Sequence, residues 1–88
     1  MIKMTMESGS VYTYDDGFVT ITPVDEPTYT IKAWQFFAFD PEEASKWNGL
    51  VEFMDTVERK EPAVGRIVLV YGKDSWRIST RIKEISND

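Results

Sequence analysis

Residues 66–85 read RIVLVYGKDSWRISTRIKEI and have the pattern of a β-hairpin. Residues 66–71 carry apolar side chains at consecutive positions, which is typical of a strand that is covered on both faces. Residues 72–75, GKDS, have the composition and length of a turn between antiparallel strands. Residues 76–85 then alternate between apolar and polar side chains, as in a strand with one buried face. We therefore expect this hairpin to lie at the centre of the sheet.

The first 22 residues of the chain predict a three-stranded meander. Residues 2–6 and 11–14 favour strands, and residues 18–22 favour a third. The sequence DDG at residues 15–17 is a strong hairpin signal, because Asp-Gly tolerates the positive φ angles of a tight turn. A loop with two prolines follows and ends the meander.

Residues 28–39 are the longest stretch with β character. Trp34 and Phe36 share one face of this strand, opposite the face that we assign to the core. Gln35 interrupts the apolar face, which indicates a bulge or an exposed end. Two interpretations of Trp34 and Phe36 stay open: the helix covers them, or they form an exposed patch of the kind that marks an interface.

The sequence DPEE at residues 40–43 predicts the start of a short helix. Aspartate can cap a helix, proline suits its first position, and glutamates are favoured at the positive end of its dipole. Asn-Gly at residues 48–49 is a stop signal. We expect about two helical turns, with Ala44 and Trp47 facing inward.

Residues 50–59 fit two interpretations. As a helix, they continue an apolar stripe that begins at Trp47; as a strand, Val51, Phe53 and Val57 alternate with polar residues. We favour the strand, because a glycine inside a helix costs about 1 kcal/mol and Asn-Gly is a natural terminator.

Together these elements predict one domain, residues 1–88, of a β-dominated α+β class. A small, bent antiparallel sheet of six to seven strands is expected, with one short helix after the long strand. So short a chain buries only about two thirds of its unfolded surface, so exposed sheet edges are a liability. Closure into a small barrel, such as an SH3-like barrel, would remove those edges.

The composition excludes several function classes. A net charge of −5 argues against binding to nucleic-acid duplexes. The chain has no cysteine and no histidine, so it lacks thiolate metal ligands, the commonest zinc ligand and the usual catalytic base. We therefore expect no enzymatic activity, cofactor or metal. No apolar run approaches the ~20 residues that span a bilayer, and the N-terminus is too polar for a signal peptide, so a cytoplasmic protein is expected.

Three cations are predicted to share one face of the last strand: Arg77, Arg81 and Lys83. Like charges in a row repel, so a compensating group is expected. It is either a small anionic ligand or acidic partner segment, or glutamates of neighbouring strands. Trp76 is either a core anchor or a platform that stacks on a ligand, and Tyr71 is a second candidate for stacking.

Three segments carry a resemblance: SGSVYTYD at residues 8–15, VGR at residues 64–66 and RISTRI at residues 77–82. Together they resemble a pattern in short, uncharacterised accessory proteins of phages of Gram-positive bacteria. The resemblance implies a phage setting and the cytoplasm of the host cell. Small accessory phage proteins often bind and disable a host factor or sequester a nucleotide signal, and the resemblance carries no catalytic residue to this chain.

Three hypotheses follow. The first is a non-enzymatic accessory protein that inhibits a host protein, such as a defence component, by direct binding. The second is a homo-oligomeric sponge that grips the phosphate of a nucleotide through its cations and stacks the base on an aromatic ring. The third is a phage structural or assembly protein. The candidate residues for binding a ligand or partner are Trp34, Phe36, Tyr71, Trp76, Arg77, Arg81 and Lys83.

Overall fold

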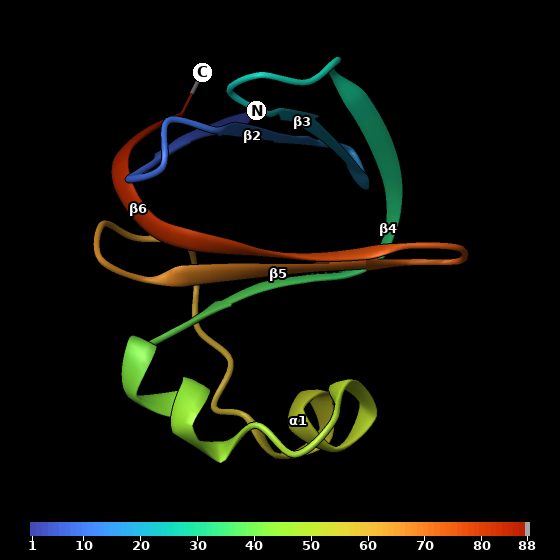
Figure 1. The fold of residues 1–88 in the computed structure, drawn as a ribbon, viewed down its shortest axis with the longest axis vertical. Coiled ribbons are helices and arrows are strands. Elements are labelled where there is room, and N and C mark those ends of the chain that lie inside the picture. Colours follow the sequence, from blue (N-terminus) through green and yellow to red (C-terminus); the bar gives the residue numbers. More distant parts are fainter. Residues whose placement is uncertain (88) are drawn as a thin grey trace.

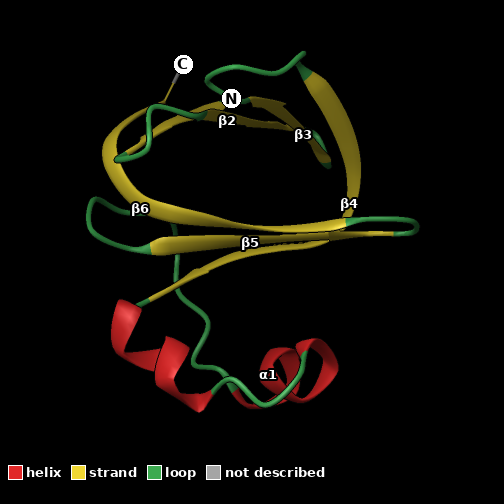
Figure 2. Ribbon diagram, viewed as in Figure 1, coloured by secondary structure: helices red, strands yellow, loops and turns green. Residues whose placement is uncertain are grey.

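The computed structural model describes residues 1–87 and shows a closed, six-stranded antiparallel β-barrel (Figures 1 and 2). Each strand pairs with the next along the chain, and the last strand closes the barrel against the first. The expectation of a small antiparallel barrel dominated by strands is confirmed. The elements are β1 (Ile2–Met6), β2 (Val11–Asp15), β3 (Phe18–Thr22), β4 (Tyr29–Phe39), the 3₁₀ helix η1 (Pro41–Lys46), α1 (Leu50–Thr56), β5 (Ile67–Gly72) and β6 (Trp76–Asn87).

The predicted meander forms β1, β2 and β3. The turn between β2 and β3 contains Asp16 at φ 48° and Gly17 at φ 83°, the two positive angles that the Asp-Gly signal indicates. Asp15 pairs with Phe18 beside this turn, so the hairpin is as tight as the sequence predicts. The predicted hairpin of β5 and β6 is also present, and Gly72 N–H donates to the carbonyl of Ser75 (2.9 Å) across its turn.

Apolar side chains inside the barrel form its main core, here called the barrel cluster. The alternation along each strand sends every second side chain inward, where the closed sheet excludes water. The buried members of the barrel cluster are Met4, Met6, Tyr12, Val19, Ile21, Ile31, Ala38, Val68, Val70 and Ile82.

A second core, here called the outer cluster, lies outside the barrel between β4, β5 and the helices. Figure 1 shows both helices on the side of β5 that faces away from β1, β2 and β3. This cover explains why β5 has apolar side chains on both faces, as its sequence predicts. The buried members of the outer cluster are Phe37, Phe39, Phe53, Met54, Val57 and Leu69.

The expectation of a strand at residues 50–59 is wrong, because α1 occupies Leu50–Thr56. The first helical segment ends at Lys46, and Gly49, at φ 128°, is the N-cap from which α1 begins. Phe53 and Met54 are then buried against the outside of the sheet, which stabilises this short helix. No helix among residues 1–87 is long and apolar enough to cross a membrane.

The helix predicted at residues 41–47 forms as η1, but none of its residues is buried. Ala44 is exposed, so its predicted inward orientation is wrong. Trp47 is 40% exposed but packs its ring on the buried Phe53 (5.0 Å between centroids), so its inward orientation is confirmed in part. A 3₁₀ helix has three residues per turn, which places side chains differently from the α-helical spacing assumed in the prediction.

Candidate functional site

The candidate site is an aromatic surface on the outside of β4, β5 and β6, here called the aromatic face: Trp34, Trp47, Tyr71 and Trp76. Trp34 meets Tyr71 edge-on, with 6.1 Å between ring centroids. Tyr71 is the cross-strand partner of Trp76, so their side chains share the outer face. Trp76 stacks on Trp47 at 5.9 Å and an interplanar angle of 28°. The four rings therefore form two contacting pairs, Trp34–Tyr71 and Trp47–Trp76, which are linked by the cross-strand neighbours Tyr71 and Trp76.

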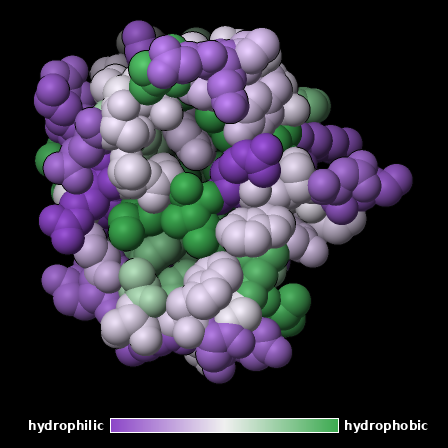
Figure 3. Space-filling model, in the orientation of Figure 1, coloured by the Kyte–Doolittle hydropathy of each residue, from purple (hydrophilic) through white to green (hydrophobic). Residues whose placement is uncertain are grey.

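The tryptophans of the aromatic face are incompletely covered. The exposed fractions of Trp34, Trp76 and Trp47 are 60%, 41% and 40%. Ile78, next along the outer side of β6, is 37% exposed. In Figure 3 hydrophobic residues come to the surface in the middle of the view and hydrophilic residues gather towards its rims. All three tryptophans of the chain thus leave much of a large apolar ring in water.

A β-bulge places Trp34 on this face. The register of β4 against β5 shifts between Ala33 and Gln35, where the sequence indicates a bulge. Before the bulge, Ile31 points into the barrel; after it, Phe36 does, because it pairs with the inward-facing Val70. Trp34 and Phe36 therefore do not share a face, which corrects the prediction that they do.

Phe36 belongs to the inside of the barrel. Its ring stacks on Tyr14 with 4.5 Å between centroids and 10° between planes, and it packs against the barrel cluster. The structure thus brings together Trp34, Tyr71 and Trp76 of the predicted binding residues and separates Phe36 from them. Phe36 contributes to packing at this position rather than to an exposed surface.

The predicted row of cations is broken by two irregularities in β6. Leu69 pairs with Ile78 but Ile67 pairs with Arg81, so Ser79 and Thr80 together oppose one residue of β5. Arg77 therefore lies on the barrel side, opposite Val70, whereas Arg81 lies on the helix side, opposite Ile67. The prediction that Arg77, Arg81 and Lys83 share one face is wrong.

Lys83 lies at the second irregularity of β6. Glu84 pairs with Thr5 and Ile82 with Met6, so Lys83 has no direct partner on β1. The suggested pairing of the three cations with glutamates is also wrong for the part of the chain that the structure describes. Its ion pairs join Lys46 to Glu43, and Lys60 and Arg66 to Asp40.

Ser79 stabilises the first irregularity from inside the sheet. Its Oγ accepts a hydrogen bond from the N–H of Val68 (2.9 Å) and donates one to the carbonyl of Thr80 (2.6 Å). The buried amide of Val68, which a regular ladder would pair with a carbonyl, is satisfied by this hydroxyl. The bulge is therefore a built feature of β6.

Arg77 lies at one mouth of the barrel beside two tyrosines. Its Nε donates to the hydroxyl of Tyr29 (2.7 Å), and its guanidinium lies 5.3 Å from the centre of the Tyr29 ring. Burial raises the pKa of Tyr12 to about 12, with Tyr29 adding to the rise and Arg77 opposing it. Tyr12 therefore stays protonated near neutral pH, where it cannot act as a base.

A charged cluster fixes the segment that carries Trp47. Asp40 accepts hydrogen bonds from Lys60 and from Arg66 Nε (3.2 Å), which join the start of η1 to the chain that leads into β5. The hydrogen bond from Lys60 is the main cause of the lowered pKa of Asp40, and Arg66 adds to it. Ala38 and Lys60 also exchange two backbone hydrogen bonds.

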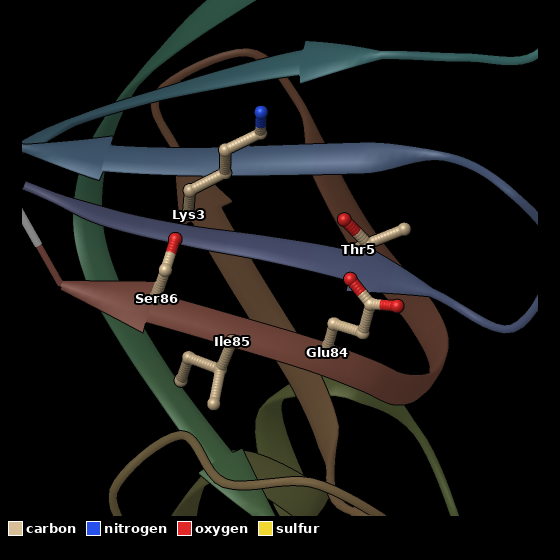
Figure 4. Close-up of a pocket in the computed structure, with 5 residues that line it drawn as sticks. All are labelled: Lys3, Thr5, Glu84, Ile85 and Ser86. Carbon is tan, nitrogen blue, oxygen red and sulfur yellow. The ribbon is translucent and has the colours of Figure 1, made fainter.

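A small hollow of about 140 Å³ lies on the outer side of β1 and β6 (Figure 4). In Figure 4 the side chains of Thr5 and Glu84 lie close together, whereas Lys3 points away from Glu84 and Ile85 points to the opposite side of the sheet. These groups do not converge on a common point. Among residues 1–87, no group of three or more acidic side chains is placed to hold a metal ion.

The sequence does not predict the position of Trp47, a member of the aromatic face, or of Ile78, which adjoins this face on β6. Helical spacing predicts that Trp47 faces inward, and the alternation along residues 76–85 places Ile78 on the apolar, buried face of its strand. For Trp47, the one indication in the sequence is the composition. The chain has twelve aromatic residues (five Phe, four Tyr and three Trp), enough to leave some for a contact surface after a small core is built.

Comparison with known proteins gave no match to a family model, a curated protein or a solved structure. The fold and the site define the chain as a small, closed antiparallel β-barrel with a partly uncovered aromatic face on one side. The resemblance to phage accessory proteins stays an expectation from the sequence.

Proposed function

We propose that this chain is a non-enzymatic binding protein that attaches to a protein partner through its aromatic face. The observation that carries the proposal is the grouping of all three tryptophans, each at least 40% exposed, on one side of the sheet. Tryptophan and tyrosine are enriched among the residues that dominate binding energy in protein interfaces. Contiguous apolar surface of this kind is more typical of a contact site than of a free surface.

The expected partner is a protein of the host cell, such as a defence component, which this chain would inhibit by occupying its surface. This part of the proposal rests on the resemblance to accessory proteins of phages. The cytoplasm of the host cell is then the expected location.

The structure does not favour the alternative of a nucleotide sponge. That function needs cations that converge on a phosphate, but Arg77 and Arg81 lie on opposite sides of the sheet. No observation favours a structural or assembly role, so we advance neither alternative.

The proposal is tested by recovering the partner from host lysate with the wild-type chain and with a Trp34→Ala/Trp76→Ala variant. Val24→Ala is the matched control, because Val24 is equally apolar and exposed but lies in the loop between β3 and β4. We expect the wild type and the control to retain one dominant protein and the double variant to lose it. Titration calorimetry with the purified partner then measures the affinity, and circular dichroism verifies that the variants are folded. Equal affinity for the double variant would exclude the aromatic face as the contact site.

A further inference from the structure

The first residues of β6 have an open backbone edge. Residues 76–81 of β6 pair with β5 on one side. On the other side, β1 begins to pair with β6 only at Ile82, and Glu7 N–H donates to the carbonyl of Arg81 (2.8 Å) just before it. Among residues 1–87, no strand pairs with the second edge of residues 76–79, here called the open edge.

The hydrogen-bonding pattern shows which backbone groups point outward at the open edge. Gly72 and Ser75 form a hydrogen-bonded pair at the turn. Antiparallel pairs alternate between bonded and non-bonded, so the next pair, Tyr71 with Trp76, is non-bonded. By the same alternation Ile78, opposite Leu69, is non-bonded too. The N–H and C=O groups of Trp76 and Ile78 therefore point away from β5. The carbonyl of Trp76 already accepts a hydrogen bond from Arg77 Nη1 (2.7 Å), so the N–H of Trp76 and both backbone groups of Ile78 are the ones that an added strand would pair with.

Free space lies beside these outward-pointing groups. A shallow hollow, largely open to solvent, is lined by residues 74–78, so it follows the open edge rather than the barrel interior. An unpaired strand edge with free space beside it can accept a further strand, as in β-augmentation.

The charge near the open edge indicates an acidic occupant. Within residues 73–79, Lys73 and Arg77 are basic and Asp74 is acidic, although the whole chain has a net charge of −5. Neither of these two cations takes part in an ion pair with a carboxylate within residues 1–87. A second copy of the chain would bring the same excess of positive charge to the edge, which like-charge repulsion disfavours.

The side chains flanking the edge indicate the pattern of the occupant. Trp76 and Ile78 lie on the outer, aromatic side of β6, and Arg77 lies between them on the barrel side. An added strand would place its side chains alternately on these two sides. We propose that the open edge binds an extended segment of the partner protein, with apolar residues beside Trp76 and Ile78 and an acidic residue beside Arg77. This inference rests on the proposed binding function and specifies how the partner is held.

The test uses a capped peptide of about seven residues in which valine and glutamate alternate. We expect it to bind with an affinity that falls with salt, and to protect the amides of Trp76 and Ile78 from hydrogen exchange measured by NMR. A peptide with lysine in place of glutamate, and one methylated on the backbone nitrogens that face the edge, should each bind at least about tenfold more weakly. Absence of binding at millimolar concentration, or equal binding of the methylated peptide, would overturn the inference.

Variants of the protein separate this inference from the proposed function. Arg77→Glu should lower the affinity for the glutamate peptide about tenfold and raise the affinity for the lysine peptide. Lys3→Glu changes an exposed cation on β1 and should change neither affinity. If the Trp34→Ala/Trp76→Ala variant no longer binds the host partner but Arg77→Glu binds it as tightly as the wild type does, the binding function is supported and strand addition is wrong. A dimer that forms through the open edge, detected by sedimentation and disrupted by the peptide, would also overturn the proposed occupant.

Discussion

The two faces of β5 are both apolar but are covered in different ways. Val68 and Val70 point into the barrel, where the other five strands enclose them, and both have no exposed surface. Leu69 and Tyr71 point outward to the helices and the aromatic face, and only Leu69 is fully buried. A closed sheet covers its own interior, whereas its outside depends on whatever else the chain supplies.

What the chain supplies is the segment between β4 and β5, and it covers only part of the outer face. Of its two helices, η1 buries none of its residues and α1 buries Phe53 and Met54. The cover therefore ends beside Trp47 and leaves Trp34 and Trp76 partly in water. The same apolar surface thus stabilises the fold on one side and remains available for contact on the other.

The largest expected effect tests whether the outer cluster stabilises the fold as strongly as the barrel interior does. Phe53→Ala removes a fully buried ring that contacts Phe39 (5.1 Å between centroids). We expect a loss of about 3–5 kcal/mol in the free energy of unfolding, measured by urea denaturation. Val51→Ala, on the exposed side of the same helix, should change stability by no more than about 0.5 kcal/mol. Equal small losses for both variants would mean that α1 is not part of the cooperative unit.

A smaller loss of stability is expected from changing the bulge at Ser79 and Thr80, which places Arg77 and Arg81 on opposite sides of the sheet. Ser79→Ala leaves the buried amide of Val68 without its acceptor, which costs about 1–3 kcal/mol. Urea denaturation measures the loss, and Ser86→Ala, an exposed serine on the same strand, is the control. If Ser79→Ala is as stable as the control, the amide has another acceptor and the bulge does not depend on this hydroxyl.

Acid should weaken the attachment of the outer segment before it affects the barrel interior, which has no carboxylate. The pKa of Asp40 is lowered in the folded chain, chiefly by the hydrogen bond from Lys60. Its stabilisation is therefore fully present above the ordinary aspartate pKa of about 3.9 and is lost as the pH falls through the lower folded-state value. The difference in the free energy of unfolding between wild type and Asp40→Asn, measured by denaturation across this pH range, should disappear in acid. A difference that does not depend on pH would contradict the role of the carboxylate charge.

The smallest effect on stability is expected on the aromatic face itself. Trp34 is 60% exposed and contacts Tyr71 at the ring edge, so Trp34→Ala should change the free energy of unfolding by no more than about 0.5 kcal/mol. Thermal denaturation checks this, with the loss from Phe53→Ala as the reference. A loss of stability comparable to that of Phe53→Ala would show that Trp34 stabilises the fold and is not a surface residue reserved for partner contact.

Local patterns in the sequence were sufficient for the strands and the barrel. The Asp-Gly turn, the turn at residues 72–75 and the doubly apolar β5 are signals that act over a few residues, and the structure contains each of them. The irregularity near Gln35 was also visible, although its consequence for Phe36 was not. Residues 50–56 fit either periodicity in so short a segment, because Val51 and Met54 continue a helical stripe whereas Val51 and Phe53 alternate as in a strand. Only the available surface of β5 selects the helix.

Alternation and turn chemistry belong to neighbouring residues, so the order of the strands and their inward and outward preference are readable from the chain alone. The side on which Trp34, Phe36, Arg77 and Arg81 lie depends on two bulges, and closure of the barrel against specific partner strands places them. The meeting of Trp47 with Trp76 likewise joins residues far apart in sequence. A shift of one residue in register reverses every side chain that follows, which is why the candidate site emerged only from the folded arrangement.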